Sequence, residues 1–196
     1  MKKLLTLALA ALLTFCLSTC TFAEAEPAPD WTARMVEAAA AGDREGGKTA
    51  EAERNAWIDA SQSGESKVSF DELCLLSRYI YAKAGSPRLS DEQRLCAGEV
   101  ALNRVASPEF PDTLPEVVAQ ELPYAAALSG SSAGRLPRAC AEAAMRLLLG
   151  ERHMELSVVY QRDLREGDVY AIFGDKLLGF TYFCRSENTE LYTGEE

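Results

Sequence analysis

The chain has 196 residues, of which 47% are hydrophobic and 26% charged, and its formal net charge is −10. This length suits one domain of ordinary size preceded by a leader, and the apolar fraction is sufficient for a buried core. The excess of acidic residues argues against binding to nucleic acid, and against adhesion to anionic lipid or teichoic acid through bulk charge. A neutral or zwitterionic glycan remains open as a partner.

The first residues have the pattern of an export signal. Lys2 and Lys3 precede an uncharged apolar run over residues 4–17, and small residues lead to a cleavage site after Ala25. The run is shorter than the roughly 20 residues that a membrane-spanning helix needs. We therefore expect residues 1–25 to be a cleaved signal peptide, and the mature protein to be secreted or associated with the cell envelope.

Cysteine and histidine usage limits the chemistry of the chain. Cys20 is a poor lipoprotein attachment site because Thr19 precedes it, so a lipid anchor is the less favoured form of export. The four cysteines after the predicted signal peptide leave three disulfide pairings open, with free buried thiols as an equal alternative; they are Cys74, Cys96, Cys140 and Cys184. No CxxC spacing occurs and His153 is the only histidine, so we expect no metal site and no cofactor.

Two regions follow the signal. Residues 26–68 are rich in Ala and Glu and predict short helices over Trp31–Ala41 and Thr49–Ala60. Their apolar faces are thin, so this stretch is interpreted as a helical lead-in packed on the main domain, or as a partly flexible arm. The main domain is expected to occupy residues 69–196.

Two capping boxes open the main domain, and each places a serine at the N-cap of a helix. The helix after Ser69 is expected to end near Ala84. The helix after Ser90 runs to about Val105 and is apolar nearly all round, which is typical of the buried centre of a domain.

The rest of the domain changes from a helical to a strand period. Helices are predicted from Thr113 to Gln120 and over residues 137–149. Residues 158–161, 169–173 and 180–184 are then β-branched and aromatic, which predicts strands. The expected fold is α+β: a mostly helical domain with a small antiparallel sheet near the C-terminus.

Three segments resemble motifs of the SleB-type (spore-cortex-lytic) cell-wall hydrolase family, in the family's order. Leu76–Ala84 is similar to the family's first helix, which ends in Tyr-x-Glu-Ala. Val100–Val105 and the loop after it closely resemble the Asn-Arg-Val signature, the most specific of the three. Leu178–Phe183 is similar to the closing Ile-Gly-x-His-x-Phe strand. The resemblance spans roughly residues 70–184.

The resemblance implies a lysozyme-like domain that cleaves the glycan strand of peptidoglycan as a muramidase or lytic transglycosylase. A glutamic acid at the end of the first helix protonates the leaving glycosidic oxygen, which requires a raised pKa. In a transglycosylase the sugar's own hydroxyl closes the ring, so one carboxylate suffices where most glycosidases use two.

The chain departs from the family pattern at three cleft positions. Lys83 stands where the family has its catalytic glutamate, and a lysine ammonium is a poor acid that opposes an oxocarbenium-like transition state. A lysine in the last helical turn also has the plain role of complementing the helix dipole. Thr181 stands where a histidine is usual, and Pro123 precedes Tyr124 where a Gln-aromatic pair is usual. Together these differences predict a degenerate active site.

Glu99 is the candidate substitute acid, because it lies on an apolar helix face where desolvation raises a carboxyl pKa. The alternative is a buried glutamate hydrogen-bonded to backbone or to an arginine. Glu109 and Asp112, in the proline-bounded loop, are expected to be solvated. The candidate substrate-binding residues, which include tyrosines that either stack on sugars or simply pack, are Tyr79, Asn103, Tyr124 and Thr181.

The sequence is compatible with three hypotheses about function. The first is an inactive homologue that binds peptidoglycan, and the second is an active lytic enzyme that uses Glu99 or another displaced carboxylate. The third is a structural envelope or spore-coat protein, connected with sporulation, that keeps only the fold and binds a protein partner.

Overall fold

A computed structural model describes residues 30–122, 135–175 and 179–192. The predicted signal peptide and Tyr124 therefore lie outside the described residues. The part from Trp31 onward groups as one compact unit, and none of its described helices is long and apolar enough to cross a bilayer.

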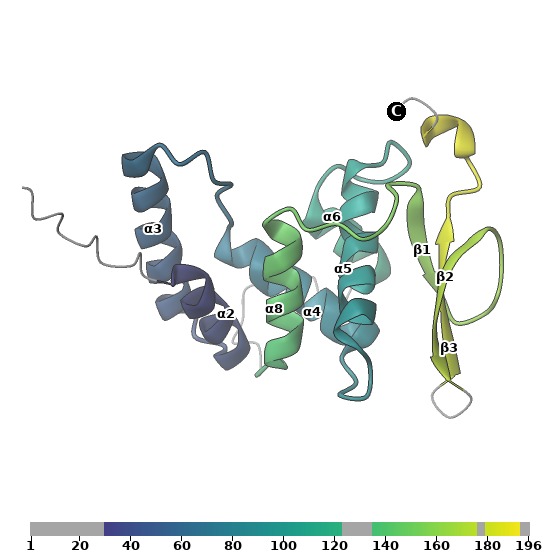
Figure 1. Cartoon of the computed structure of the whole chain (residues 1–196), viewed down its shortest axis with the longest axis horizontal. Helices are drawn as coiled ribbons and strands as arrows, with labels where there is room; N and C mark the ends of the chain where they lie inside the picture. Colours follow the sequence, from purple (N-terminus) through teal and green to yellow (C-terminus); the bar gives the residue numbers. More distant parts are fainter. Residues whose placement is uncertain (1–29, 123–134, 176–178, 193–196) are drawn as a thin grey trace, which may run out of the picture. The chain divides into compact units, whose positions relative to one another are not determined.

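The fold class predicted from the sequence is confirmed: helices come first along the chain and a small antiparallel sheet follows (Figure 1). The helices are α2 (Trp31–Ala41), α3 (Arg44–Ser61), α4 (Phe70–Ala84), α5 (Asp91–Ala106), α6 (Leu114–Glu121) and α8 (Arg138–Leu148). The strands are β1 (Val158–Arg162), β2 (Val169–Asp175) and β3 (Gly179–Arg185), and a 3₁₀ turn, η1, covers Thr189–Tyr192.

Helix starts follow the capping residues, with two differences from the sequence-based expectation. Ser90 caps α5 by accepting a hydrogen bond from the backbone N–H of Gln93 at 3.1 Å, whereas Ser69 precedes α4 without a side-chain cap. Helix α3 begins at Arg44 rather than Thr49, because Asp43 caps the N–H of Gly46 at 2.9 Å. The glycine pair at 46–47, which reads as a helix breaker, lies inside the helix instead.

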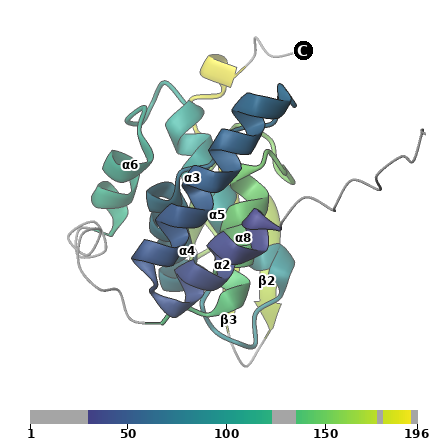
Figure 2. The ribbon, with the colours of Figure 1, turned by 90° about the vertical axis from the view of Figure 1, so that its left-hand side faces the viewer.

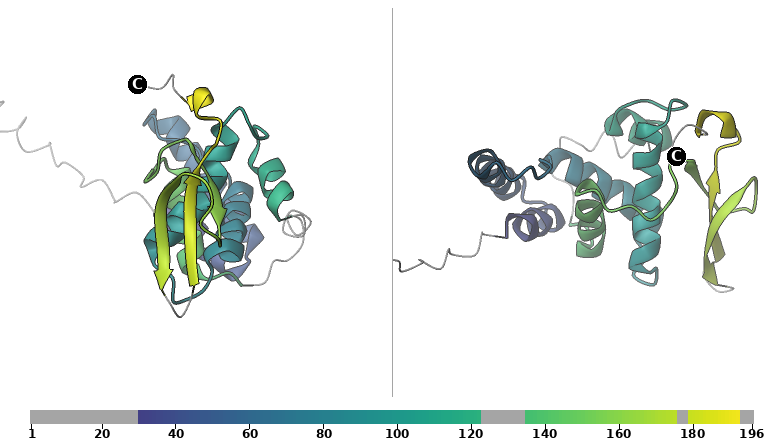
Figure 3. Two further views of the ribbon diagram at one scale, coloured as in Figure 1. Left: turned by 90° about the vertical axis from the view of Figure 1, so that its right-hand side faces the viewer. Right: turned by 45° about the horizontal axis from the view of Figure 1, so that its top comes forward.

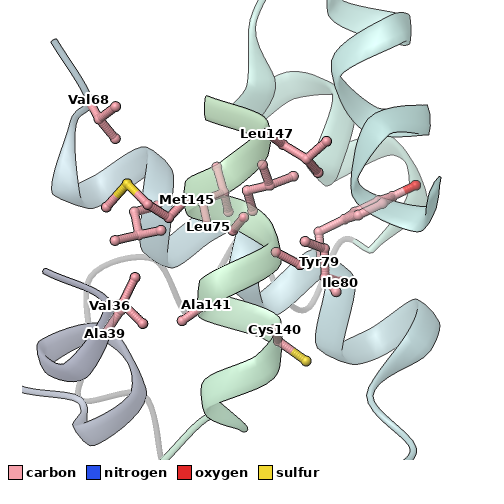
Figure 4. Packing of buried hydrophobic residues seen from close by; sticks show 14 of the residues in the cluster. Val36, Ala39, Val68, Leu75, Tyr79, Ile80, Cys140, Ala141, Met145 and Leu147 are labelled. Atoms are coloured by element: carbon pink, nitrogen blue, oxygen red, sulfur yellow. The ribbon is translucent and has the colours of Figure 1, made fainter. Parts of the chain in front are cut away.

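The main core lies between the helices. Helices α4 and α8 pack together, with α2 against them and α5 contacting both from another side (Figures 1 and 2). Their apolar side chains form the cluster shown in Figure 4, which includes the fully buried Met35 of α2. The core thus extends into the segment that the sequence divides off as a lead-in. A side chain at Gly98 would lie within 2.7 Å of both Leu147 and Ile80, so this glycine permits the close approach of α5.

The sheet has the order β1-β3-β2 and is antiparallel throughout (Figure 3). Strand β1 contacts α5, and a second apolar cluster lies there; its buried members are Cys96, Val100, Met154, Val158 and Phe183. This packing places the start of β1 beside the Asn-Arg-Val segment of α5, which positions the candidate site.

The four cysteines of the described residues are unpaired. Cys96 lies in the cluster against the sheet, whereas Cys140 lies in the core between the helices. Burial raises the pKa of all four thiols, that of Cys96 to about 12. They therefore have little thiolate character, and Cys96, Cys140 and Cys184 act as small buried hydrophobes.

Candidate functional site at the end of helix α4

The last turn of α4 carries Lys83, the residue that the sequence resemblance places at the family's acid position. Its ammonium forms an ion pair with Glu121, with 2.5 Å between Nζ and Oε2. Tyr79 lies one turn earlier on the same face of α4, and its hydroxyl donates to the same carboxylate oxygen at 2.9 Å. Lys83 Nζ is 5.7 Å from the centre of the Tyr79 ring. Glu121 ends α6, so this contact joins α4 to α6.

Arg104 of α5 completes the group around Glu121. Its guanidinium pairs with Glu121 Oε1, and its Nε donates to the backbone oxygen of Val159 at 2.6 Å. The guanidinium also lies 4.8 Å from the ring centre of Phe110 and 5.6 Å from that of Tyr160. We refer to Tyr79, Lys83, Arg104 and Glu121 as the Glu121 cluster.

Burial differs within the Glu121 cluster. Tyr79 and Arg104 are buried, whereas the side chains of Lys83 and Glu121 are 24% and 16% exposed. Burial by itself would raise the pKa of Glu121, but the hydrogen bond from Lys83 and the charges of Arg104 and Lys83 outweigh it and lower this pKa. Burial and the nearby Glu121 carboxylate raise the pKa of Tyr79. Glu121 is therefore an ionised carboxylate at neutral pH and has no proton to donate.

Strand β1 borders this cluster through Gln161. Its side-chain N–H donates to the backbone oxygen of Lys83 at 3.4 Å, a long hydrogen bond. The other end of the amide, Oε1, is buried and has no hydrogen-bond partner among the described residues. The site thus combines an ion pair that reaches solvent with an amide oxygen that has spare accepting capacity.

Glu99, the candidate substitute acid, has 0% exposure. Its carboxylate accepts hydrogen bonds from the backbone N–H of His153, at 3.0 and 2.9 Å, and of Met154, at 2.9 Å. These bonds tie the turn before β1 to the central helix. The carboxylate is fully buried and its oxygens are occupied by backbone donors, so this geometry favours the anchoring interpretation over a proton donor in contact with substrate.

The remaining candidate binding residues also make internal contacts. The side-chain amide of Asn103 donates to the backbone oxygens of Glu155, at 2.9 Å, and Val158, at 3.0 Å. Thr181 accepts a long hydrogen bond, 3.4 Å, from the side chain of Gln93. The structure therefore gathers Tyr79 and Lys83 in one cluster, while Asn103 holds the chain entering β1 and Thr181 links β3 to the start of α5.

The carboxylate of Glu109 is partly buried, so the expectation that it is solvated was wrong, whereas Asp112 is exposed as expected. Glu109 accepts hydrogen bonds from the hydroxyl of Ser186, the amide of Asn188 at 2.6 Å, and the hydroxyl of Tyr192 at 2.8 Å. Burial alone would raise its pKa, but these three hydrogen bonds outweigh burial and lower it. The loop after α5 is thereby fastened to the segment after β3.

Glu109→Gln is expected to cost about 1 kcal/mol of unfolding free energy at pH 7, because the charge-assisted hydrogen bonds are lost. A carboxyl group with a lowered folded-state pKa contributes stability above its unfolded pKa, about 4.3, and loses that contribution as pH falls through the folded value. Urea unfolding at pH 7 and at pH 3 measures the effect. The gap between wild type and variant should narrow at the lower pH, and a gap that is unchanged there would contradict the prediction.

Arg104 and Glu121 are the site residues that the sequence did not single out. Arg104 lies inside the Asn-Arg-Val motif, which was a usable signal, but Glu121 has no pattern of its own next to Gln120. Its role depends on partners from two other helices, α4 and α5. The described residues hold no group of three or more His, Cys, Asp or Glu side chains that would suit a metal ion.

Comparison with known proteins finds one family model that matches part of the chain. Residues 90–170 match the model of the Cell Wall Hydrolase family, a range that contains α5, α6, α8 and β1. The match begins after Lys83, so the correspondence of Lys83 with the family's acid rests on the resemblance of the first helix. No curated protein and no solved structure matches the chain significantly. Residues 90–170 are therefore similar to the Cell Wall Hydrolase family, in agreement with the SleB-type resemblance of the sequence.

Proposed function

We propose that this protein acts at the cell envelope, where it binds the glycan strands of peptidoglycan without cleaving them. Similarity to the Cell Wall Hydrolase family supports peptidoglycan as the ligand. The predicted signal peptide supports export. The observation that carries the absence of cleavage is the ion pair of Lys83 with Glu121, at the position where the resemblance requires a protonated glutamic acid.

Neither nearby carboxylate replaces that acid readily. Glu121 is held ionised by its cationic partners, and a general acid must carry a proton at the working pH. Glu99 is fully buried, and backbone N–H groups occupy its oxygens. A glycan binder needs neither group to be protonated, and the partly exposed side chains of Lys83 and Glu121 offer both a donor and an acceptor to sugar hydroxyls.

An active lytic enzyme is the second candidate, and Glu121 is the observation that favours it. This carboxylate reaches the end of the Lys83 side chain, so a displaced carboxylate does exist beside the expected acid position. In that case Glu121 would act in its ionised form, as a base or as a stabiliser of an oxocarbenium-like transition state.

Incubation of the mature protein with isolated peptidoglycan tests the proposal. We expect the protein to sediment with the insoluble glycan, and mass spectrometry of the soluble fraction to show no new muropeptides. A Lys83→Glu variant is run in parallel, and release by that variant alone would show that the cleft is otherwise intact. Anhydro-ended or reducing-ended fragments from the wild type would overturn the proposal in favour of an active enzyme. Absence of binding would favour a structural envelope or coat protein.

A further inference from the structure

The carboxylate of Glu121 lies at the tip of the residue-83 side chain. Lys83 comes from the last turn of α4 and Glu121 from the last residue of α6, so the contact depends on the packing of two helices that are separated in sequence. The contact joins Lys83 Nζ to the carboxylate oxygen Oε2 at 2.5 Å.

Glu121 is also fixed by groups other than Lys83. The Tyr79 hydroxyl donates to Oε2, and Arg104 pairs with Oε1. Arg104 is itself fixed by the backbone oxygen of Val159 and by the ring of Phe110. The carboxylate therefore keeps two of its three partners if Lys83 is replaced, and both of these partners favour its ionised form.

We propose that Glu121 is the positioning residue of this site: its carboxylate, fixed by Tyr79 and Arg104, anchors the Lys83 side chain here and would make a carboxylic acid introduced at position 83 keep its proton to a higher pH than an ordinary glutamic acid does. Two carboxyl groups in contact do not both ionise readily, so the second one retains its proton. The site thus retains a device for holding an acid in its protonated form, although a lysine now occupies the acid's position. The inference rests on the proposed function only in taking residue 83 as the place of that acid.

The charges around the site have opposite effects on the pKa of an acid introduced at position 83. Arg104 would favour ionisation of an introduced acid, but it contacts Glu121 through Oε1, whereas residue 83 contacts Oε2. The two oxygens share one negative charge, and the carboxylate is the charged group in direct contact with residue 83. Tyr79 is neutral because burial and the Glu121 charge raise its pKa, and Gln161 of β1 is uncharged. The repulsion from Glu121 is therefore expected to dominate.

Carboxyl titration by NMR, with carbon-13 in the glutamate side chains, tests this directly. In Lys83→Glu the signal that is new relative to wild type is expected to titrate about one pH unit or more above the same signal in Lys83→Glu/Glu121→Gln. Equal titration in the two variants, or a value in the single variant below that of an ordinary glutamate, would overturn the inference.

A second variant tests the fixation of Glu121 without introducing a new acid at position 83. Lys83→Met keeps the length of an unbranched side chain in a half-exposed last helical turn and adds no charge. Glu121 is expected to titrate below an ordinary glutamate in this variant as in wild type, because Tyr79 and Arg104 still hold it. A normal or raised value would show that Lys83 alone sets its ionisation and would sink the inference. Cleavage of glycan by the wild type would contradict the proposed function and leave both titration results standing.

Discussion

Replacement of Arg104 by methionine is expected to lower the free energy of unfolding by about 3 kcal/mol, because a buried ion pair and a backbone contact are lost together. Arg104 is 6% exposed and joins Glu121 of α6 to the Val159 oxygen of β1. Methionine fills similar volume but leaves the Val159 oxygen without this donor. Arg104→Lys, which keeps the charge but loses the planar fork of donors, is expected to fall between wild type and Arg104→Met.

Arg162→Met is the matched control for this prediction. Arg162 also stacks on Tyr160, with 4.8 Å between its guanidinium and the ring centre, but its ion pair with Glu166 lies at the surface. Replacement of Arg162 is expected to lower the free energy of unfolding by less than about 1 kcal/mol. Urea unfolding followed by circular dichroism measures the free energy of unfolding of all three variants. Equal losses of this free energy in Arg104→Met and Arg162→Met would show that the Glu121 cluster adds nothing to stability.

Glu99→Gln is expected to destabilise the protein by about 2 kcal/mol and to leave glycan binding unchanged. The amide has nearly the shape of the carboxylate, but its NH₂ group would face a backbone N–H of His153 or Met154 that now donates to Glu99. One buried donor then loses its acceptor. Thermal unfolding measures the loss, which corresponds to roughly 4–8 °C in a domain of this size.

The comparison variant for Glu99 is Glu155→Gln, since Glu155 pairs with Arg185 at the surface, with 2.8 Å between the two groups. That change is expected to cost less than about 1 kcal/mol. A Glu99→Gln protein of wild-type stability would contradict the anchoring role. Loss of peptidoglycan cleavage in such a stable variant would instead identify Glu99 as the substitute acid.

Local patterns were sufficient for much of the fold. The periodic apolar positions after Ser90 predicted α5, and the β-branched and aromatic runs predicted all three strands, because both signals depend on side chains close together in the chain. The Asn-Arg-Val segment pointed to the family, which the match over residues 90–170 confirmed. The start of α3 was wrong because the Asp43 cap offsets the cost of the two glycines inside the helix.

Position 83 was also predicted as a site position from the sequence alone, since the motif of the first helix and Lys83 lie within one helix. The chemistry of this position was not predicted, because the partners of Lys83 come from other parts of the chain. Glu121 reaches it from α6, and Arg104 reaches Glu121 from α5 while it also holds β1. The ionisation of a carboxyl group depends on charges and donors within a few ångströms in space, whatever their separation in sequence. The sequence by itself thus determined the α+β class and the resemblance to the cell-wall hydrolases, and it predicted the loss of the acid at position 83. Only the tertiary packing decided which carboxylate faces Lys83.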